Sequence, residues 1–213
     1  MATLPSGTLM AVATAFAAAK TVSGISNAAE AVVSGTAHGY SVGDIVQLYS
    51  GWGRLNRRAV KVKSTTTDTF VAEAIDTTNT EFFPAGSGGG TVRKVTTFTQ
   101  ISKYLNPQSS GGEPKRVTVR FMDEDTDTSL NDGFTAVQES FDIDADQFGG
   151  AAYAALRTLS EVQTDTILKK TLKSGVNIYT PCKVSLNENP KMADGSIMTN
   201  AVSIDGNGRI TRY

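Results

Sequence analysis

Two stretches near the middle of the chain alternate between apolar and polar residues, which is the pattern of β-strands with one buried and one solvated face. In the first, Val117, Val119 and Phe121 alternate with Arg116, Thr118 and Arg120. In the second, Val137, Phe141 and Ile143 alternate with Gln138, Ser140, Asp142 and Asp144. We interpret them as an antiparallel pair within the segment from Glu113 to Asp146. Glu139 is an exception, because its carboxylate falls on the apolar side of the second strand.

A polar segment from Asp123 to Gly133 joins these two strands. Its acidic side chains are Asp123, Glu124, Asp125, Asp127 and Asp132. Such a segment is too polar to bury, and a long loop in a small domain usually belongs to a binding site or a contact. We therefore predict a mobile loop that becomes ordered when it contacts another molecule.

The remaining hydrophobic pattern predicts further strands and one helix. Apolar residues recur at helical spacing over about 151–162, at Ala152, Leu156, Leu159 and Val162, with Asp146 or a neighbour as the cap. We expect this helix to pack on a sheet. Strands are predicted for 8–19, 98–105 and 166–172, for several short runs within 24–95, and for a terminal hairpin over 201–212 that turns at 205–208. The segment 106–114 is predicted to be a loop.

The first strand has an alternative interpretation as a signal peptide, since Thr8 to Ala19 is apolar and small. A signal peptide has a positive charge before the apolar run, whereas the first lysine, Lys20, follows it. We favour a strand, in which Met10, Val12 and Phe16 form the bulky face and the intervening alanines allow a neighbour to approach closely.

Composition limits the classes of function. Of 213 residues, 19% are charged, 39% are hydrophobic and 20 are glycine, which is typical of a β-rich, loop-rich protein. The formal net charge is −1, so the chain lacks the basic character of a nucleic-acid-binding protein. Cys182 is the only cysteine, which excludes an internal disulfide and a multi-cysteine metal site. No apolar run is long enough to span a bilayer.

Candidate catalytic and metal-binding groups are few. His38 is the only histidine and lies in a turn motif, and Cys182 follows a proline in a strand-like run. The triplets Asp142-x-Asp144-x-Asp146 and Asp123-x-Asp125-x-Asp127 resemble the start of a calcium loop but lack its glycine and its final acid. A weak cation site in either triplet stays open as an alternative. We predict no catalytic residue, no cofactor and no specific metal site, which favours a structural protein over an enzyme.

One resemblance covers about a third of the chain. Its most specific part is the run from His38 to Asp44, of the form His-Gly-x-x-x-Gly-Asp, followed by Val60-Lys61-Val62, Thr69-Phe70 and Gly88-Gly89-Gly90. This pattern resembles a small β-barrel repeat found in many phage tail and fibre proteins. The resemblance implies an inserted packing module at residues 24–95.

A second resemblance covers about half of the chain. It is carried, in order, by Ser110 to Val119, Asn131 to Phe134, Phe141 to Asp146, Ser185 to Met192 and Gly208 to Tyr213. These motifs resemble the major tail tube proteins of long-tailed, siphovirus-type bacteriophages. The implied fold is mainly β, a β-sandwich or barrel with one packed α-helix, plus the small inserted barrel. Residues 1–23 and 96–213 would form the tail-tube domain.

The resemblance also implies a function and partners. Six subunits would form a ring whose inner sheets close into one barrel, and rings would stack into the tube through which the genome is ejected into the host. The subunit would be assembled in the host cytoplasm, reside in the virion tail and contact a tape measure protein, a tail terminator and distal tail proteins. DNA would pass through without specific binding, and no membrane would be involved.

Two surfaces are candidates for this assembly. We place Gln138, Ser140, Asp142 and Asp144 in the lumen, with an ordinary solvated sheet face as the alternative from alternation alone. We place the acidic segment with Asp123, Glu124, Asp125, Asp127 and Asp132 in a contact between subunits or rings.

Two other functions remain open on the sequence. The chain could be another tail component, such as a terminator or baseplate protein. It could also be a glycan-binding fibre module, which would need exposed aromatic residues clustered on one face, for which Trp52, Tyr49 and Tyr40 are candidates.

Overall fold

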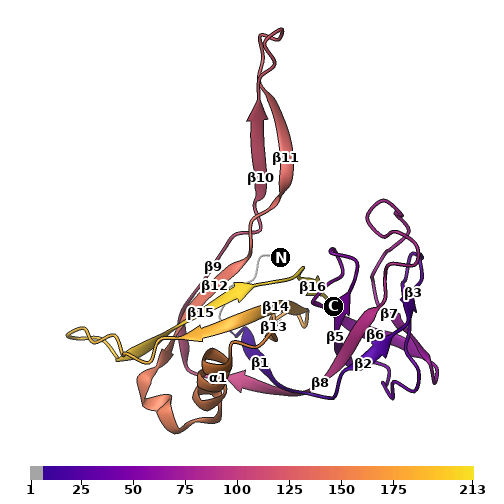
Figure 1. Ribbon diagram of the computed structural model, residues 1–213. Helices are drawn as coiled ribbons and strands as arrows, with labels where there is room; N and C mark the ends of the chain where they lie inside the picture. Colours follow the sequence, from indigo (N-terminus) through magenta and orange to yellow (C-terminus); the bar gives the residue numbers. More distant parts are fainter. Residues whose placement is uncertain (1–6) are drawn as a thin grey trace.

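The expected mainly β class is confirmed by the structure, a computed structural model that describes residues 7–213 (Figure 1). Strands make up 48% of the chain and helix 7%. The first six residues of the predicted tail-tube segment 1–23 lie outside the described residues.

The larger part of the fold is an antiparallel sheet of seven strands. Their order is β8-β1-β13-β14-β15-β12-β9. The strands are β1 (Leu9–Phe16), β8 (Gly90–Ile101), β9 (Tyr104–Ser110), β12 (Gln138–Asp144), β13 (Thr166–Thr171), β14 (Asn177–Leu186) and β15 (Thr199–Gly206). Short β16 (Thr211–Arg212) also pairs with β14. The predicted first strand is confirmed, with Met10 and Val12 buried.

The smaller part contains six short strands that continue the same sheet through β8. They are β2 (Lys20–Val22), β3 (Gly24–Ile25), β4 (Val32–Ser34), β5 (Ile45–Ser50), β6 (Arg58–Thr65) and β7 (Thr69–Ala72). Their order is β3-β4-β7-β6-β5-β8, and β2 also pairs with β8. This part has a hydrophobic core of its own, built around Trp52, Phe70 and Leu48. Strand β8 thus passes from one core to the other (Figure 1).

One helix covers one face of the larger sheet. The prediction of 151–162 is confirmed by α1 (Ala151–Val162), which buries Tyr153, Leu156 and Leu159 against Phe141 and other core residues. Val162, at the end, is 60% exposed. The predicted cap is wrong for this helix: Gly150 is its N-cap and forms no side-chain cap hydrogen bond. The Asp144 side chain instead caps the preceding 3-10 helix η1 (Ala145–Gly149) by accepting from the backbone N–H of Asp146.

The larger sheet curls around this core. Tyr104 lies on β9, at the end of the sheet, yet its hydroxyl donates to the carbonyl of Thr8, beside β1, over 2.5 Å. In the order of the sheet, four strands separate β9 from β1. A flat sheet would hold them about 20 Å apart or more. The sheet therefore folds over itself as in a sandwich, with the apolar residues inside and the buried side of α1 packed against them.

The predicted pairing of the two central stretches is wrong. The first stretch forms β10 (Pro114–Val119), which pairs with β11 (Thr128–Phe134) in a separate hairpin that projects from the body (Figure 1). The second stretch forms β12, which pairs with β15 and β9. The acidic segment is thus partly a strand and partly the tip of this hairpin. Alternation identified the strands correctly but carries no information on which strand pairs with which.

Two further local predictions are wrong. The predicted loop 106–114 contains most of β9 and the first residue of β10. The predicted terminal hairpin does not form, because β15 and β16 pair one after the other with β14 and not with each other. Between them, the Asn207 N–H donates to the carbonyl of Pro181 over 3.0 Å. Pro181 has no N–H to donate in return, so the pairing with β14 is interrupted there and residues 207–210 do not form a strand.

Candidate assembly surfaces

The candidate lumen residues lie together on one face of β12. Gln138, Ser140, Asp142 and Asp144 alternate with Phe141 and Ile143, which are 2% and 0% exposed on the helix-covered side. Neighbouring strands add polar residues to the same face: Gln108 and Ser110 from β9, Ser203 and Asp205 from β15, and Lys183 and Ser185 from β14. The result is a broad polar face on the outside of the curled sheet.

The carboxylates of this face are mostly paired with cations or amides. Asp142 lies 2.8 Å from the Lys191 ammonium and accepts from Asn106 over 3.3 Å, and the Lys191 hydrogen bond lowers the pKa of Asp142. Asp144 lies 3.9 Å from Lys103. Within residues 7–213, no group of three or more His, Cys, Asp or Glu side chains is placed to hold a metal ion. The face is therefore polar without a concentrated charge of either sign.

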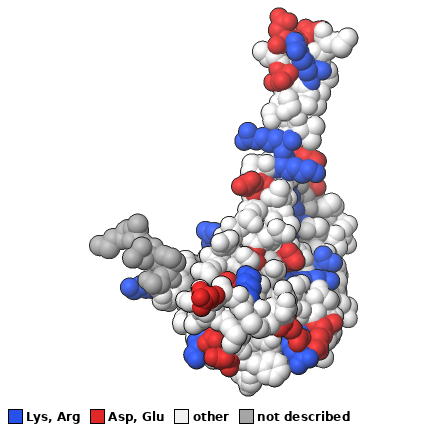
Figure 2. All heavy atoms as spheres, turned by 90° about the vertical axis from the view of Figure 1, so that its left-hand side faces the viewer, with Lys and Arg blue, Asp and Glu red and all other residues white. Residues whose placement is uncertain are grey.

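The second candidate surface is divided between two places. Asp123, Glu124, Asp125 and Asp127 lie at the exposed tip of the β10–β11 hairpin, whereas Asp132 lies in β11 and pairs with Lys115 over 3.5 Å. Figure 2 shows the hairpin as a narrow column with acidic side chains at its end. Apolar side chains are also exposed along it, including Val117 at 44%, Phe121 at 56% and Leu130 at 54%. Sequence reasoning missed this second feature, because the alternation had suggested that the valines were buried.

Two edges of the larger sheet carry no partner strand among the described residues. Strand β9 is the last in the sheet order. At the other end, residues 96–101 of β8 pair with β1 on one side, whereas β5 pairs only with residues 90–94 on the other side. Unpaired edges are templates for strand addition, and proteins usually cover or blunt them. Sequence reasoning had treated β9 as a loop and so could not find the first edge.

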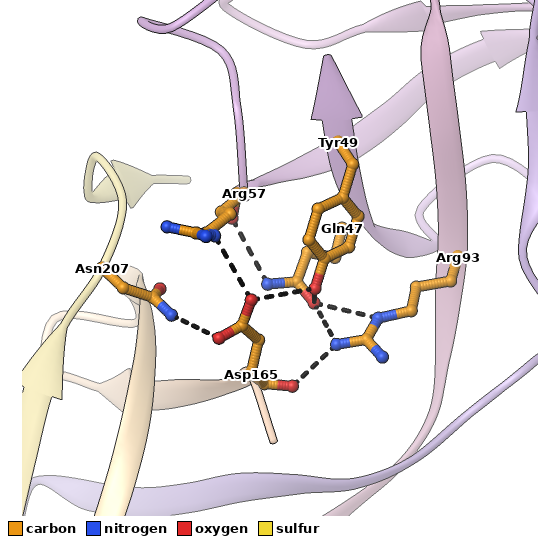
Figure 3. A network of polar contacts seen from close by, with 6 residues as sticks. All are labelled: Gln47, Tyr49, Arg57, Arg93, Asp165 and Asn207. Carbon is orange, nitrogen blue, oxygen red and sulfur yellow. Dashed lines mark hydrogen bonds and ion pairs between the residues drawn. The ribbon is translucent and has the colours of Figure 1, made fainter. Parts of the chain in front are cut away.

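A polar network connects the smaller part of the fold to the larger sheet (Figure 3). Asp165, just before β13, accepts from Asn207 over 2.7 Å and lies 3.3 Å from the Arg57 Nε. Arg93 donates to the Asp165 carbonyl and to Gln47, each over 2.7 Å. Asp165 and Asn207 belong to the larger part, and the other three residues belong to the segment 24–95. The network therefore fixes that segment against the sheet.

Two of the three aromatic candidates for glycan binding are buried, and the third, Tyr49, is half-buried. Trp52 is 2% and Tyr40 is 7% exposed, and both belong to the core of the smaller part. His38 is also buried there, and its Nδ1 accepts from the Tyr40 N–H over 3.0 Å, which stabilises the turn. Cys182 is fully buried, and burial raises the pKa of its thiol to about 12. The wet aromatic face that sugar recognition requires is thus missing from this cluster.

Comparison with known proteins identifies the family. The family model for phage tail tube proteins (TTP) matches residues 50–213, which is most of the chain. The chain belongs to the phage tail tube protein family. The match begins at the end of β5 and includes the hairpin, α1 and the six strands of the larger sheet that follow. No curated protein matches the chain.

Family membership makes this tail tube protein a structural component of the virion tail, which assembles into a tube together with other tail proteins. The polar face, the open sheet edges and the hairpin are the surfaces that such an assembly has available. No helix within residues 7–213 is long and apolar enough to span a membrane.

Proposed function

We propose that six copies of this tail tube protein close head to tail into a ring, and that the rings stack into the genome conduit of a long-tailed, siphovirus-type phage. The observation that carries the proposal is the pair of open edges in one sheet, β9 and residues 96–101 of β8. Because every neighbouring pair between them is antiparallel, β8 and β9 run in the same direction. Strand β9 of one copy then pairs with β8 of the next in parallel, and repetition around an axis leaves no edge.

The polar face of β12 lines the lumen in this arrangement. A conduit for DNA must let the phosphates slide, and dense positive charge would retain them. Gln138, Ser140, Asp142 and Asp144 offer amide, hydroxyl and carboxylate groups, and two nearby lysines, Lys103 and Lys191, are engaged by the carboxylates. Lys183 is then the one exposed lysine of this face outside the two ion pairs, and a single ammonium per subunit is not dense positive charge, so DNA passes without specific binding. A tape measure protein occupies the same lumen before ejection, and terminator and distal tail proteins close the two ends of the tube.

The segment 24–95 is an inserted small β-barrel in this proposal, carried on each subunit beside the ring. Its separate core and its attachment through Asp165 support a rigid appendage. The family match begins within this segment, at residue 50. The hairpin tip makes a contact between subunits or rings.

Electron microscopy of the purified protein tests the ring directly. We expect hollow tubes or annular particles whose class averages have six-fold symmetry. Dispersed monomers at all concentrations would contradict the proposal, and rings that never stack would favour a terminator.

Proline substitution in β9 tests the edge. Successive backbone N–H groups point to opposite sides of a strand, so one of the variants Gln108→Pro and Ser109→Pro removes an outward N–H and leaves the pairing with β12 intact. We expect that variant to keep the wild-type circular dichroism spectrum and to sediment as a monomer. Ala85→Pro is the control and should assemble, because Ala85 is exposed and the hydrogen bond of its turn is donated by the Ser87 N–H.

A further inference from the structure

The β10–β11 hairpin has the features of a segment that binds a partner. It is a two-stranded ribbon with no third strand, and such ribbons are marginally stable on their own. Val117 pairs with Leu130 across it, so the two exposed apolar side chains share one face. Met122, at the tip, is fully exposed. Contiguous exposed apolar surface marks an interaction site.

The tip of the hairpin is strongly acidic. Asp123, Glu124, Asp125 and Asp127 are all exposed, and none of them is in a salt bridge with another described residue. Within residues 120–127 the only basic side chain is Arg120. The tip thus combines unpaired negative charge with the apolar side chains of Phe121 and Met122.

A groove with the complementary character lies at the base of the same hairpin. Its volume is about 930 Å³, and its lining includes Phe134, Val137 and Ile210 together with Arg54, Arg58 and Arg209. No carboxylate of the described residues lies within salt-bridge distance of these three arginines, although the chain contains 21 acidic residues. Outside the hairpin, eight of the fourteen other basic residues are paired with acids. The groove therefore offers apolar surface beside three uncompensated guanidinium groups.

Two of the three arginines are held in place by neighbours that are not acids. Arg54 stacks over the Phe82 ring, with its guanidinium carbon 3.2 Å from the ring centroid. The Arg58 Nε donates to the Thr211 hydroxyl over 3.1 Å. Burial is the largest cause that lowers the pKa of Arg58; Tyr213 opposes the shift, and repulsion from the like charge of Arg209 adds to it. An acidic occupant would relieve this repulsion.

A chain cannot place its tip in its own groove. Gly112, Gly133 and Phe134 line the groove and also form the base of the hairpin, so the tip points away from it (Figure 1). With about 12 extended residues between Gly112 and the tip, the separation is about 40 Å. The acidic occupant that matches the groove in charge and apolar character is therefore the tip of another copy.

We propose that the hairpin tip of one copy docks in the arginine groove of a second copy. Phe121 and Met122 pack on the apolar lining, and Asp123, Glu124 and Asp125 face Arg54, Arg58 and Arg209. Because tip and groove are different surfaces, one contact leaves the groove of the donating copy and the tip of the accepting copy free, and the contact propagates. The inference rests on the proposed assembly into a tube. That assembly includes a contact made by the hairpin tip, and the inference names the surface that the tip contacts.

Cysteine cross-linking tests the contact directly, because the native Cys182 is buried and unreactive. Met122→Cys is introduced in one copy and Ile210→Cys in another copy that carries a size tag, and the two are mixed under mild oxidation. We expect a heterodimer on a non-reducing gel. Met122→Cys mixed with tagged Val162→Cys is the control; Val162 is 60% exposed but lies outside the groove, so it should cross-link poorly. Equal yields with both partners would overturn the proposal.

Charge reversal adds a test of specificity. In this assay Arg54→Glu with Arg209→Glu should lower the cross-link yield about tenfold, the effect of roughly one lost favourable charge contact. Combining it with Asp123→Lys and Asp125→Lys in the copy that donates the tip should restore the yield. The control replaces the tip variant by Asp146→Lys with Glu161→Lys, near α1, which changes the net charge by the same amount. With this control the lowered yield should not recover. If the groove variant still cross-links but no longer binds duplex DNA, the groove is a phosphate-binding site and the docking proposal is wrong.

The two proposals fail separately. If the wild-type protein forms tubes but Met122→Cys and Ile210→Cys do not cross-link selectively, only the docking is wrong. If selective cross-linking occurs and electron microscopy shows open chains without rings, the docking holds and the six-fold ring is wrong.

Discussion

Lys170 Nζ lies 2.6 Å from Glu139 Oε1, although two strands separate β13 from β12 in the sheet. Flat strands three positions apart would be about 14 Å from each other, so this pair exists only because the sheet curls. The Glu139 side chain is 5% exposed and that of Lys170 is 20% exposed. The pair thus closes the core at the side remote from the helix.

Breaking this pair should destabilise the fold strongly. Lys170→Met leaves the Glu139 carboxylate buried without its cation, and such a change costs about 3 kcal/mol. Glu139→Gln should cost less, because the amide can still accept a hydrogen bond. The double variant Glu139→Leu with Lys170→Met should recover much of the loss, since it leaves no buried charge. Urea unfolding of the monomer measures each free energy.

A second ion pair of the same length provides the control. Lys63 also lies 2.6 Å from a carboxylate, that of Glu30, but their side chains are 52% and 39% exposed. Lys63→Met should change the free energy of unfolding by less than about 1 kcal/mol. If both lysine variants lose the same stability, burial is not what gives the Glu139 pair its importance.

The Asp165 network should control the attachment of the segment 24–95. Asp165→Ala leaves Arg57 and Asn207 without their acceptor while the Arg93 contact to the backbone carbonyl remains, so we expect a loss of about 2 kcal/mol. The expected consequence is faster proteolysis between the two cores, where β8 connects them. Limited proteolysis followed by mass spectrometry locates the cuts. Asp76→Ala, an exposed acid that contacts only Thr78 in its own turn, should leave the digestion pattern unchanged.

Local patterns were sufficient to predict the helix and many strands. The spacing of Ala152, Leu156 and Leu159 gave α1 its bounds, because helical periodicity depends only on nearby residues. The alternation over β12 likewise placed Gln138 to Asp144 on one polar face. Even the misplaced Glu139 was visible as an exception.

What the sequence could not supply was the partner of each segment. The partner of Glu139 is 31 residues away on a strand whose register depends on two others. Val117 and Phe121 alternate like core residues, yet both are exposed, and the surface that we propose to cover Phe121 belongs to another copy. The arginine groove gathers residues from three distant parts of the chain, and no spacing rule connects them.

Buried tyrosines should make the fold sensitive to alkali. Burial raises the pKa of Tyr40 and of Tyr213 to about 12, above their value of 10.0 in the unfolded chain. Between pH 10 and 12 the unfolded chain loses these protons while the folded chain keeps them. The stabilising effect is thus complete below pH 10 and is lost as pH rises to 12. Unfolding free energies measured across this range should fall.

Tyr213→Phe separates the contribution of the last residue. The Tyr213 hydroxyl accepts from the Lys61 N–H and donates to the Glu73 carbonyl, at 3.0 and 3.1 Å. Its removal should cost about 1 kcal/mol at pH 7 and make the alkaline fall in stability less steep. An unchanged slope would show that the hydroxyl does not titrate in this range.

The assignment of the polar face to the lumen leads to a test by chemical access. Ser140→Cys places a thiol on that face, and Ala154→Cys places one on the exposed side of α1, across the sheet. In assembled tubes a small maleimide should label both, whereas a maleimide with a long polyethylene glycol chain should label only Ala154→Cys. In the dissociated monomer both reagents should label both positions. Native Cys182 contributes no signal, because a thiol with a pKa of about 12 is protonated at neutral pH and this one is fully buried.

Each pattern of labelling has a distinct meaning, because the two positions lie on opposite faces of the same sheet. Protection of Ser140→Cys alone places the β12 face inside the tube. Protection of Ala154→Cys alone would invert the subunit and put the helix in the lumen, which would contradict our assignment of Gln138, Ser140, Asp142 and Asp144. Equal labelling of both positions in intact tubes would mean that the polar face is an ordinary solvated surface. Gel shifts of the labelled bands quantify all three outcomes in one experiment.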